Sequence, residues 1–277
     1  MLLIAYFGDN QFVGVNHTGG KGSEYLEKYS SVESIASTLR EAWLVGIRDF
    51  SFTVMPRTTA AINEIYADCP FRLHPAVPYA HAVYDLVAQK GLAGALLAKL
   101  KNIGIYNVVR STAYAGCGRY TPLISALLKA ELSGLPVDGV KSIGLLNITT
   151  DFLLGSKRVD VLANFHGAAE GMGLKPTFYT MNPVLLVTAL DKNRLAGSRV
   201  VFNLNDSGFR VNPSMPEVLA LLQKPSSHEY LVMSLFSGAR GGVEEFLETV
   251  PNLHGVLFGS SNRKHIEENY RAILCAV

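Results

Sequence analysis

The feature that most constrains the fold is an alternation of short apolar runs with amphipathic stretches, repeated about eight times along the 277 residues. Each run ends in polar or glycine residues, and the stretch after it has helical spacing. The runs are almost continuously apolar, which indicates strands buried on both faces of a parallel sheet. The sequence therefore predicts an α/β fold, a single (β/α)8 TIM barrel over residues 1–277, a class that commonly holds about 250 residues.

The expected strands are runs rich in β-branched and aromatic residues. They span 12–16, 49–54, 72–78, 142–148, 177–182, 199–205, 230–236 and 255–258. A helix over 32–45 is expected to begin after a Ser31 cap and to end at Gly46. A last helix is expected over 263–274.

Residues 82–133 predict a helical insertion, although 105–109 also has the composition of a strand, which would then lie outside the barrel. An open doubly wound sheet is the competing architecture. It is disfavoured because no G-x-G-x-x-G follows an early strand.

Charge and composition exclude several classes of function. A net charge of +2 with scattered Lys and Arg gives no basic footprint for nucleic acid. No apolar run approaches the roughly 20 residues of a membrane span, and the apolar segment 1–7 lacks the basic residues of a signal peptide. Three widely spaced cysteines form no metal or redox pair. We therefore expect a cytoplasmic protein. We also expect no bound metal, because carboxylates at strand ends are scarce.

Barrel enzymes carry their reactive residues at the C-terminal ends of the strands. We take His17 as the candidate for proton transfer, because imidazole titrates near neutral pH. Asp151 is a candidate base or histidine-orienting group, and Asn16 completes the catalytic set. The alternatives are that His17 fixes its loop and that Asp151 caps a helix.

Polar side chains at the other strand ends predict a site for a polar substrate, where amides also stabilise a developing oxyanion. The alternative is that each amide satisfies local backbone groups. The expected substrate-binding residues are Arg57, His74, Tyr79, Asn147, Asn182, Asn203 and Asn205.

The loops after the last two strands predict a corner that binds a phosphate or a carboxylate. Glycines allow close approach of the backbone, and serine hydroxyls and free N–H groups at a helix start donate hydrogen bonds. The alternative is that these residues only turn the chain and cap the helix. The corner comprises Ser237, Gly238, Arg240, Gly259, Ser260, Ser261 and Arg263.

About the last forty residues, through Ser237-Gly238, 253–261 and 265–269, resemble the C-terminal end of aldo-keto reductases. In that family a similar segment grips the phosphate of a nicotinamide cofactor. The family's tetrad of Asp, Tyr, Lys and His is absent: Asp49 stands only at the start of its strand, His74 replaces the lysine, and Asn147 replaces the histidine.

Three hypotheses follow. The first is a lyase or isomerase that uses no cofactor and acts by proton transfer on a small phosphorylated or carboxylated metabolite. The second, implied by the resemblance, is an NADPH- or NADH-dependent oxidoreductase with a non-standard active site. The third is a non-catalytic ligand-binding barrel. A homo-oligomer is left open.

Overall fold

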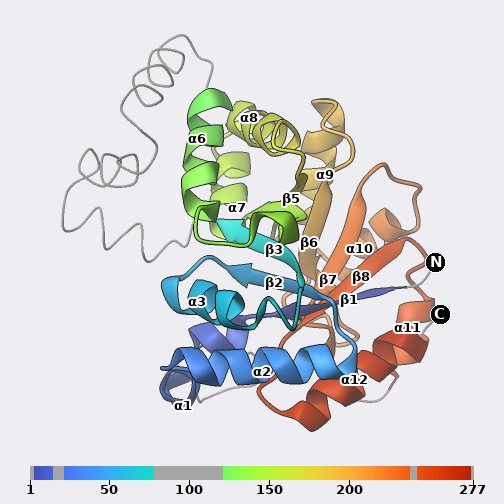
Figure 1. Cartoon of the computed structure of the whole chain (residues 1–277). Helices are drawn as coiled ribbons and strands as arrows, with labels where there is room; N and C mark the ends of the chain where they lie inside the picture. Colours follow the sequence, from blue (N-terminus) through green and yellow to red (C-terminus); the bar gives the residue numbers. More distant parts are fainter. Residues whose placement is uncertain (1–2, 15–21, 78–120, 238–241, 276–277) are drawn as a thin grey trace.

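Eight parallel strands close into a barrel in the order β1 to β8 in this computed structural model, which describes residues 3–14, 22–77, 121–237 and 242–275 (Figure 1). The barrel closes because β1 pairs with both β2 and β8. This confirms the (β/α)8 fold and excludes the open sheet. The strands are β1 Ile4–Gly8, β2 Asp49–Thr53, β3 Arg72–Val77, β4 Ser142–Leu145, β5 Lys175–Tyr179, β6 Arg199–Asn203, β7 Glu229–Met233 and β8 Leu253–Phe258.

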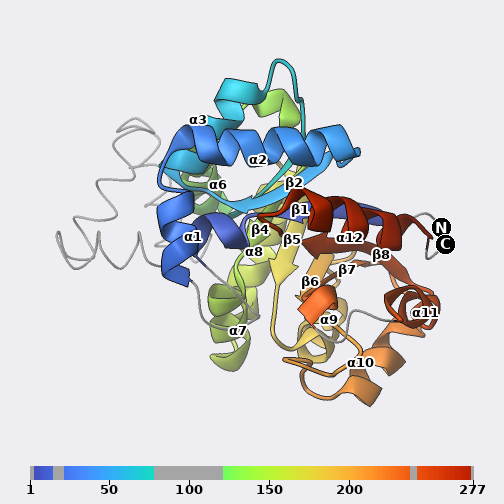
Figure 2. The ribbon, with the colours of Figure 1, turned by 90° about the horizontal axis from the view of Figure 1, so that it is seen from below.

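Helices surround the barrel, and α2 and α12 lie side by side on one flank (Figure 2). They are α1 Gly22–Lys28, α2 Val32–Val45, α3 Pro56–Ile65, α6 Thr121–Leu132, α7 Asn147–Gly155, α8 Val159–Glu170, α9 Pro183–Lys192, α10 Met215–Leu222, α11 Val243–Glu248 and α12 Arg263–Cys275. The described residues also form the 3₁₀ helices η1 Asn10–Val13, η2 Val137–Gly139 and η3 Leu235–Ser237.

The helix predicted over 32–45 is confirmed with both of its ends. The Ser31 hydroxyl accepts a hydrogen bond from the Ser34 N–H, and Gly46 takes a left-handed φ of 116°. The last helix is confirmed as α12. In the predicted insertion, α6 confirms the helix after residue 120, whereas 78–120, with the ambiguous stretch 105–109, lies outside the described residues.

The predicted first strand, 12–16, is wrong. The strand is β1, Ile4–Gly8, and Phe12 belongs to the 3₁₀ helix η1. Phe12 is fully buried, with its ring 4.8 Å from that of Tyr29. Phe12 therefore packs outside the barrel rather than pairing in it, because burial overrides local β propensity; residues 15 and 16 of the predicted strand lie outside the described residues.

Several other strands end earlier than predicted. Strand β4 ends at Leu145, and Asn147 already begins α7; β5 ends at Tyr179, β6 at Asn203 and β7 at Met233. The polar residues beyond these ends lie in loops and helix starts at the carboxyl rim of the barrel. That rim is where barrel folds build their sites.

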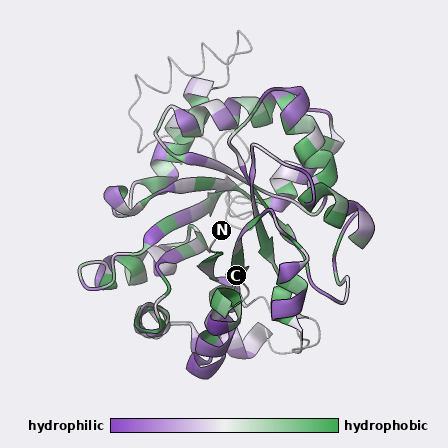
Figure 3. Cartoon of the chain, turned by 90° about the vertical axis from the view of Figure 1, so that its right-hand side faces the viewer, coloured by the Kyte–Doolittle hydropathy of each residue, from purple (hydrophilic) through white to green (hydrophobic). Residues whose placement is uncertain are grey.

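The hydrophobic residues form two separate groups, one between strands and helices and one inside the barrel. The outer group includes the rings of Phe7, Phe50 and Phe52. The inner group is Tyr6, Ala76, Tyr179, Val201 and Leu231. Figure 3 shows the corresponding pattern, with hydrophobic colour on the strands and much hydrophilic colour on the outer helices and loops.

Gly255 in β8 leaves no room for a side chain, because a Cβ there would lie 2.6 Å from the Ile4 carbonyl oxygen. We expect Gly255→Ala to lower the free energy of unfolding by about 1–3 kcal/mol, the usual effect of overpacking. The matched control is Gly167→Ala in α8, where a Cβ meets nothing within 4 Å; it should stabilise by roughly 0.5–1 kcal/mol. Urea unfolding of both variants measures the difference, and equal effects would contradict the packing argument.

Candidate functional site

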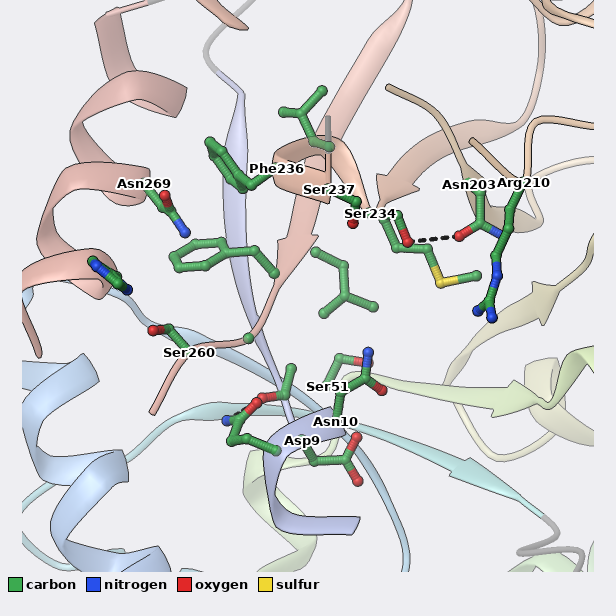
Figure 4. A pocket seen from close by; sticks show the side chains of 18 of the residues that line it. Asp9, Asn10, Ser51, Asn203, Arg210, Ser234, Phe236, Ser237, Ser260 and Asn269 are labelled. Carbon is green, nitrogen blue, oxygen red and sulfur yellow. Dashed lines mark hydrogen bonds between the residues drawn. The ribbon is translucent and has the colours of Figure 1, made fainter. Parts of the chain in front are cut away.

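A cavity of about 1020 Å³ opens at the carboxyl ends of the strands. This volume is at the upper end of the range of ligand pockets, about 300–1,000 Å³. In Figure 4, Asp9 and Ser51 lie on one side, Asn203 and Arg210 on another, and Ser260 and Asn269 on a third. The cavity thus joins residues from both ends of the chain.

Asp9 follows β1 and is buried in the cavity wall. Its Oδ2 accepts a hydrogen bond of 2.7 Å from the Thr53 N–H at the end of β2. Burial raises the pKa of this carboxyl to about 6, although hydrogen bonds from Thr53 act in the opposite direction. A carboxyl with this pKa exchanges its proton near neutral pH, as general acids and bases do.

Tyr179 and Ser51 form the floor of the cavity. Their hydroxyl oxygens lie 2.5 Å apart, and burial raises the pKa of Tyr179 to about 12, so the phenol is neutral. The Tyr179 ring fits because β4 has Gly144 opposite it, where a Cβ would lie 2.7 Å from the ring. The pair supplies hydroxyl groups to a ligand.

The structure brings Asn147 and Asn203 to the cavity. The Asn203 Oδ1 accepts a 2.7 Å hydrogen bond from the Ser234 hydroxyl (Figure 4). Asn205 and Asn182 instead organise the chain around them: Asn205 binds both backbone groups of Phe209, and Asn182 caps α9. The amide set therefore divides between ligand-facing and structural positions.

Asp151 and Arg57 do not line the cavity. Asp151 accepts hydrogen bonds from the Thr180 hydroxyl and the Met181 N–H, so it holds the β5–α9 loop. Arg57 donates to the Tyr29 carbonyl. Asn16, His17 and Tyr79 lie outside the described residues.

His74, predicted inside its strand as a substrate-binding residue, lies one layer deeper in the barrel than Ala76, which lines the cavity. Its Nε2 is 2.9 Å from Asp49 Oδ1, and its Nδ1 is 2.8 Å from the Ser142 hydroxyl and 3.2 Å from Arg199 Nη1. Alternate residues of a strand share one face, so the inward side of β3 descends from Ala76 to His74 to Arg72. His74 thus belongs to a buried polar layer.

Of the predicted anion corner, Ser237, Gly259, Ser260 and Ser261 line the cavity. Arg263 is exposed and is not part of the lining, and Gly238 and Arg240 lie outside the described residues. The Ser260 hydroxyl accepts from the Asn262 N–H at the start of α12. The four residues therefore line one cavity, and the N-terminus of α12 lies beside Ser260 and Ser261.

Other residues of this part of the cavity were not among the predicted anion-binding residues, although the resemblance to aldo-keto reductases extends over 265–269. His265 and Asn269 of α12 line the cavity, as do Glu244 and Glu245 of α11. Gly259 is tightly enclosed, because a Cβ there would lie 2.3 Å from Gln11 Oε1. The helical spacing of His265 and Asn269, one turn apart, was the signal in the sequence that placed them on one face.

Residues 3–14, 22–77, 121–237 and 242–275 contain no cluster of His, Cys, Asp or Glu that would hold a metal ion. Within the same ranges no helix has the length and apolar character needed to cross a bilayer.

Comparison with known proteins identifies the fold. No protein-family model and no curated protein matches the chain. Two structures from Pseudomonas aeruginosa, both provisionally assigned as aldo-keto reductases, match 98% of this chain with a TM-score of 0.56. One is 11% identical, with 88% of its own chain covered, and the other is 14% identical, with 90% covered. The chain is therefore a (β/α)8 barrel similar in fold to these structures along nearly its whole length.

Proposed function

We propose that the chain is a nicotinamide-dependent oxidoreductase whose reactive groups differ from the aldo-keto reductase tetrad. The observation that carries the proposal is the extent of one cavity. It runs from Ser51 and Tyr179 on the floor, past the ends of β7 and β8, to His265 and Asn269 on α12. A small metabolite would fill only part of such a cavity, whereas a dinucleotide is long enough to reach both ends.

The donor groups of the corner fit a pyrophosphate. Ser237, Ser260 and Ser261 supply hydroxyls, and the first turn of α12 supplies N–H groups and a favourable dipole. Glu244 and Glu245 add carboxylates to the same cavity. A carboxylate accepts hydrogen bonds from ribose hydroxyls and repels a 2′-phosphate, so we expect NADH to bind more tightly than NADPH.

The rest of the cavity suits the reactive end of such a cofactor, which supplies a hydride when bound. Met233, Leu257 and Phe236 line it with apolar surface at the ends of β7 and β8. Apolar surface of this kind excludes water and strengthens the polar contacts beside it. The carboxyl and hydroxyl groups of Asp9, Ser51 and Tyr179 line the same cavity and carry exchangeable protons.

NADH titration, followed by calorimetry, tests the proposal. We expect Ser260→Asp to weaken binding at least about tenfold, which corresponds to about 1.4 kcal/mol, because it places a negative charge beside the phosphates. The cap of α12 is Asn262, whose Oδ1 accepts a hydrogen bond from the Lys264 N–H, so α12 should stay folded in this variant. The control is Ser227→Asp, which adds the same charge to the exposed loop before β7, at the opposite rim. If wild type binds neither NADH nor NADPH, the proposal is wrong.

The buried carboxyl of Asp9 also favours a second candidate, a cofactor-independent lyase or isomerase acting on a small carboxylated or phosphorylated metabolite. In this case the serine corner would hold the anionic group of the substrate. Thermal stabilisation by such metabolites without any response to NADH would favour it over the oxidoreductase.

A further inference from the structure

We propose that Asp9 is the proton-transferring residue of the cavity, holding a proton that it gives to a carbonyl oxygen of the bound substrate. The reaction assigned to it rests on the proposed oxidoreductase function. The position of the Asp9 carboxyl and its protonation do not rest on that function, because they depend only on the residues around the end of β1.

The carboxyl of Asp9 does not cap the helix that follows it. Asp9 occupies the N-cap position of η1, where aspartate usually accepts a hydrogen bond from the next turn, yet its side chain makes no capping bond. It accepts the Thr53 N–H instead, across from β1 to β2. The carboxyl is thereby held in the wall of the cavity.

The surroundings of Asp9 favour a neutral carboxyl. Among the residues that the structure describes, no Lys, Arg or His forms an ion pair with it, and Oδ2 is anchored by an uncharged amide. Burial without a nearby cation favours the protonated acid. The titratable side chains that line the same cavity are Tyr25, Tyr179, Arg210, Glu244, Glu245, His265 and Glu268.

Asp49 provides an internal comparison one strand away. It is as buried as Asp9, but Arg72 and His74 hydrogen bond to its carboxylate. Burial alone would raise its pKa, and these partners outweigh burial, so the pKa lies below its ordinary value. Asp49 is therefore an ionised structural group, whereas Asp9, with its pKa raised to about 6, gains and loses a proton near neutral pH in the wall of the cavity.

Tyr179 lies within electrostatic reach of Asp9, since a negative charge on Asp9 raises the pKa of Tyr179 further. The phenol remains neutral and shares a short hydrogen bond with Ser51. A carbonyl oxygen at the cavity floor would thus meet hydroxyl groups beside the Asp9 carboxyl, an arrangement that stabilises developing negative charge.

The proton balance of the step is simple. As the carbonyl carbon accepts a hydride with its electron pair, the π electrons of the C=O bond move to oxygen. That oxygen takes the proton from the Asp9 carboxyl and becomes an alcohol. The Asp9 carboxylate then regains a proton from water that enters through the cavity mouth.

The first test is the thermal stability of Asp9→Asn. Asparagine preserves the shape and still accepts the Thr53 N–H. Because the pKa of Asp9 is raised on folding from 3.8 to about 6, ionisation destabilises the folded protein above about pH 6, and this penalty disappears as the pH falls toward 3.8. We therefore expect Asp9→Asn to melt several degrees higher than wild type at pH 8, with the gain lost near pH 4.

The matched control is Asp49→Asn, which should melt lower than wild type at pH 8, because it removes an ionised partner of Arg72 and His74. If Asp9→Asn also melts lower at pH 8, Asp9 is a structural group like Asp49 and the proposal is overturned.

The second test asks whether a ligand reaches the carboxyl. In protein labelled with ¹³C at the aspartate carboxyls, the Asp9 signal is identified by its loss in Asp9→Asn. Acetophenone, an uncharged ketone, should shift this signal at pH 6 and leave the signal of exposed Asp206 unchanged. An unmoved Asp9 signal overturns the proposal. If the signal moves but NADH does not bind, the oxidoreductase assignment fails and the role of Asp9 remains.

Discussion

Replacing Asp49 by alanine is expected to lower the free energy of unfolding by about 3 kcal/mol at pH 7, the upper end of the usual cost of leaving buried donors without their acceptor, because Asp49 and His74 are buried while Arg72 is half exposed. Asp49 accepts hydrogen bonds from Arg72 and from the Nε2 of His74. Arg199, beside His74, pairs in turn with Glu229. Without the carboxylate, buried polar groups in the lower layer of the barrel lose their acceptor.

For a chain of this size the loss corresponds to a fall in melting temperature on the order of 10 °C. Differential scanning calorimetry of Asp49→Ala measures it, with the exposed Asp206→Ala as the control. A fall of less than a degree or two in Asp49→Ala would show that this layer does not hold the barrel together.

The same layer determines how stability depends on pH. The pKa of Asp49 is lowered on folding, so its contribution is present above its ordinary value of 3.8 and is lost as the pH falls through the lower folded value. Burial lowers the pKa of His74 below 6.5, so the folded protein loses stability as the pH falls below 6.5. Both effects lower the free energy of unfolding in acid. In Asp49→Ala, the pH dependence that comes from Asp49 should be absent.

Replacing Phe50 by alanine is expected to destabilise the protein by about 3–5 kcal/mol, as for other large buried aromatic residues. Its ring is fully buried and stacks on Phe52 with centroids 4.8 Å apart. It also lies 6.3 Å from the rings of Phe7 and Phe12. Its removal would leave a cavity between the barrel and the segments that cover it.

The matched control is Phe152→Ala in α7, where the side chain is 71% exposed. Its stability should change by no more than about 0.5 kcal/mol. Guanidinium unfolding distinguishes the two variants, and a small loss in Phe50→Ala would mean that neighbouring rings collapse into the space.

The architecture could be predicted because its signals are local. Ser31 and Gly46 mark the ends of α2 through hydrogen bonding and a left-handed φ, properties of single residues. The start of β2 was likewise visible in its apolar run. The first strand was missed because the runs 4–8 and 12–16 look equally β-like, and only the pairing of β1 with β2 and β8 distinguishes them.

That single error hid the most informative residue of the site. With the strand placed at 12–16, the mouth of the barrel was assigned to Asn16 and His17, and Asp9 lay before the expected strand. His74 was predicted to bind the substrate for a related reason: the sequence shows which strand carries a residue, and not how deep in the barrel that residue lies.

The order and type of the elements from α2 to α3 and from α6 onward, the closed barrel they imply and the serines after the last strand were determined by the sequence alone, because hydrophobic period and capping chemistry act over a few residues. Only the tertiary structure decided which polar groups share a cavity and which are buried with partners. Asp9 and Asp49 are the same residue type on adjacent strands. Asp49 pairs with Arg72 and His74, whereas no Lys, Arg or His in the described part of the chain pairs with Asp9, and this difference separates a buried ion pair from the carboxyl that we propose as a proton donor.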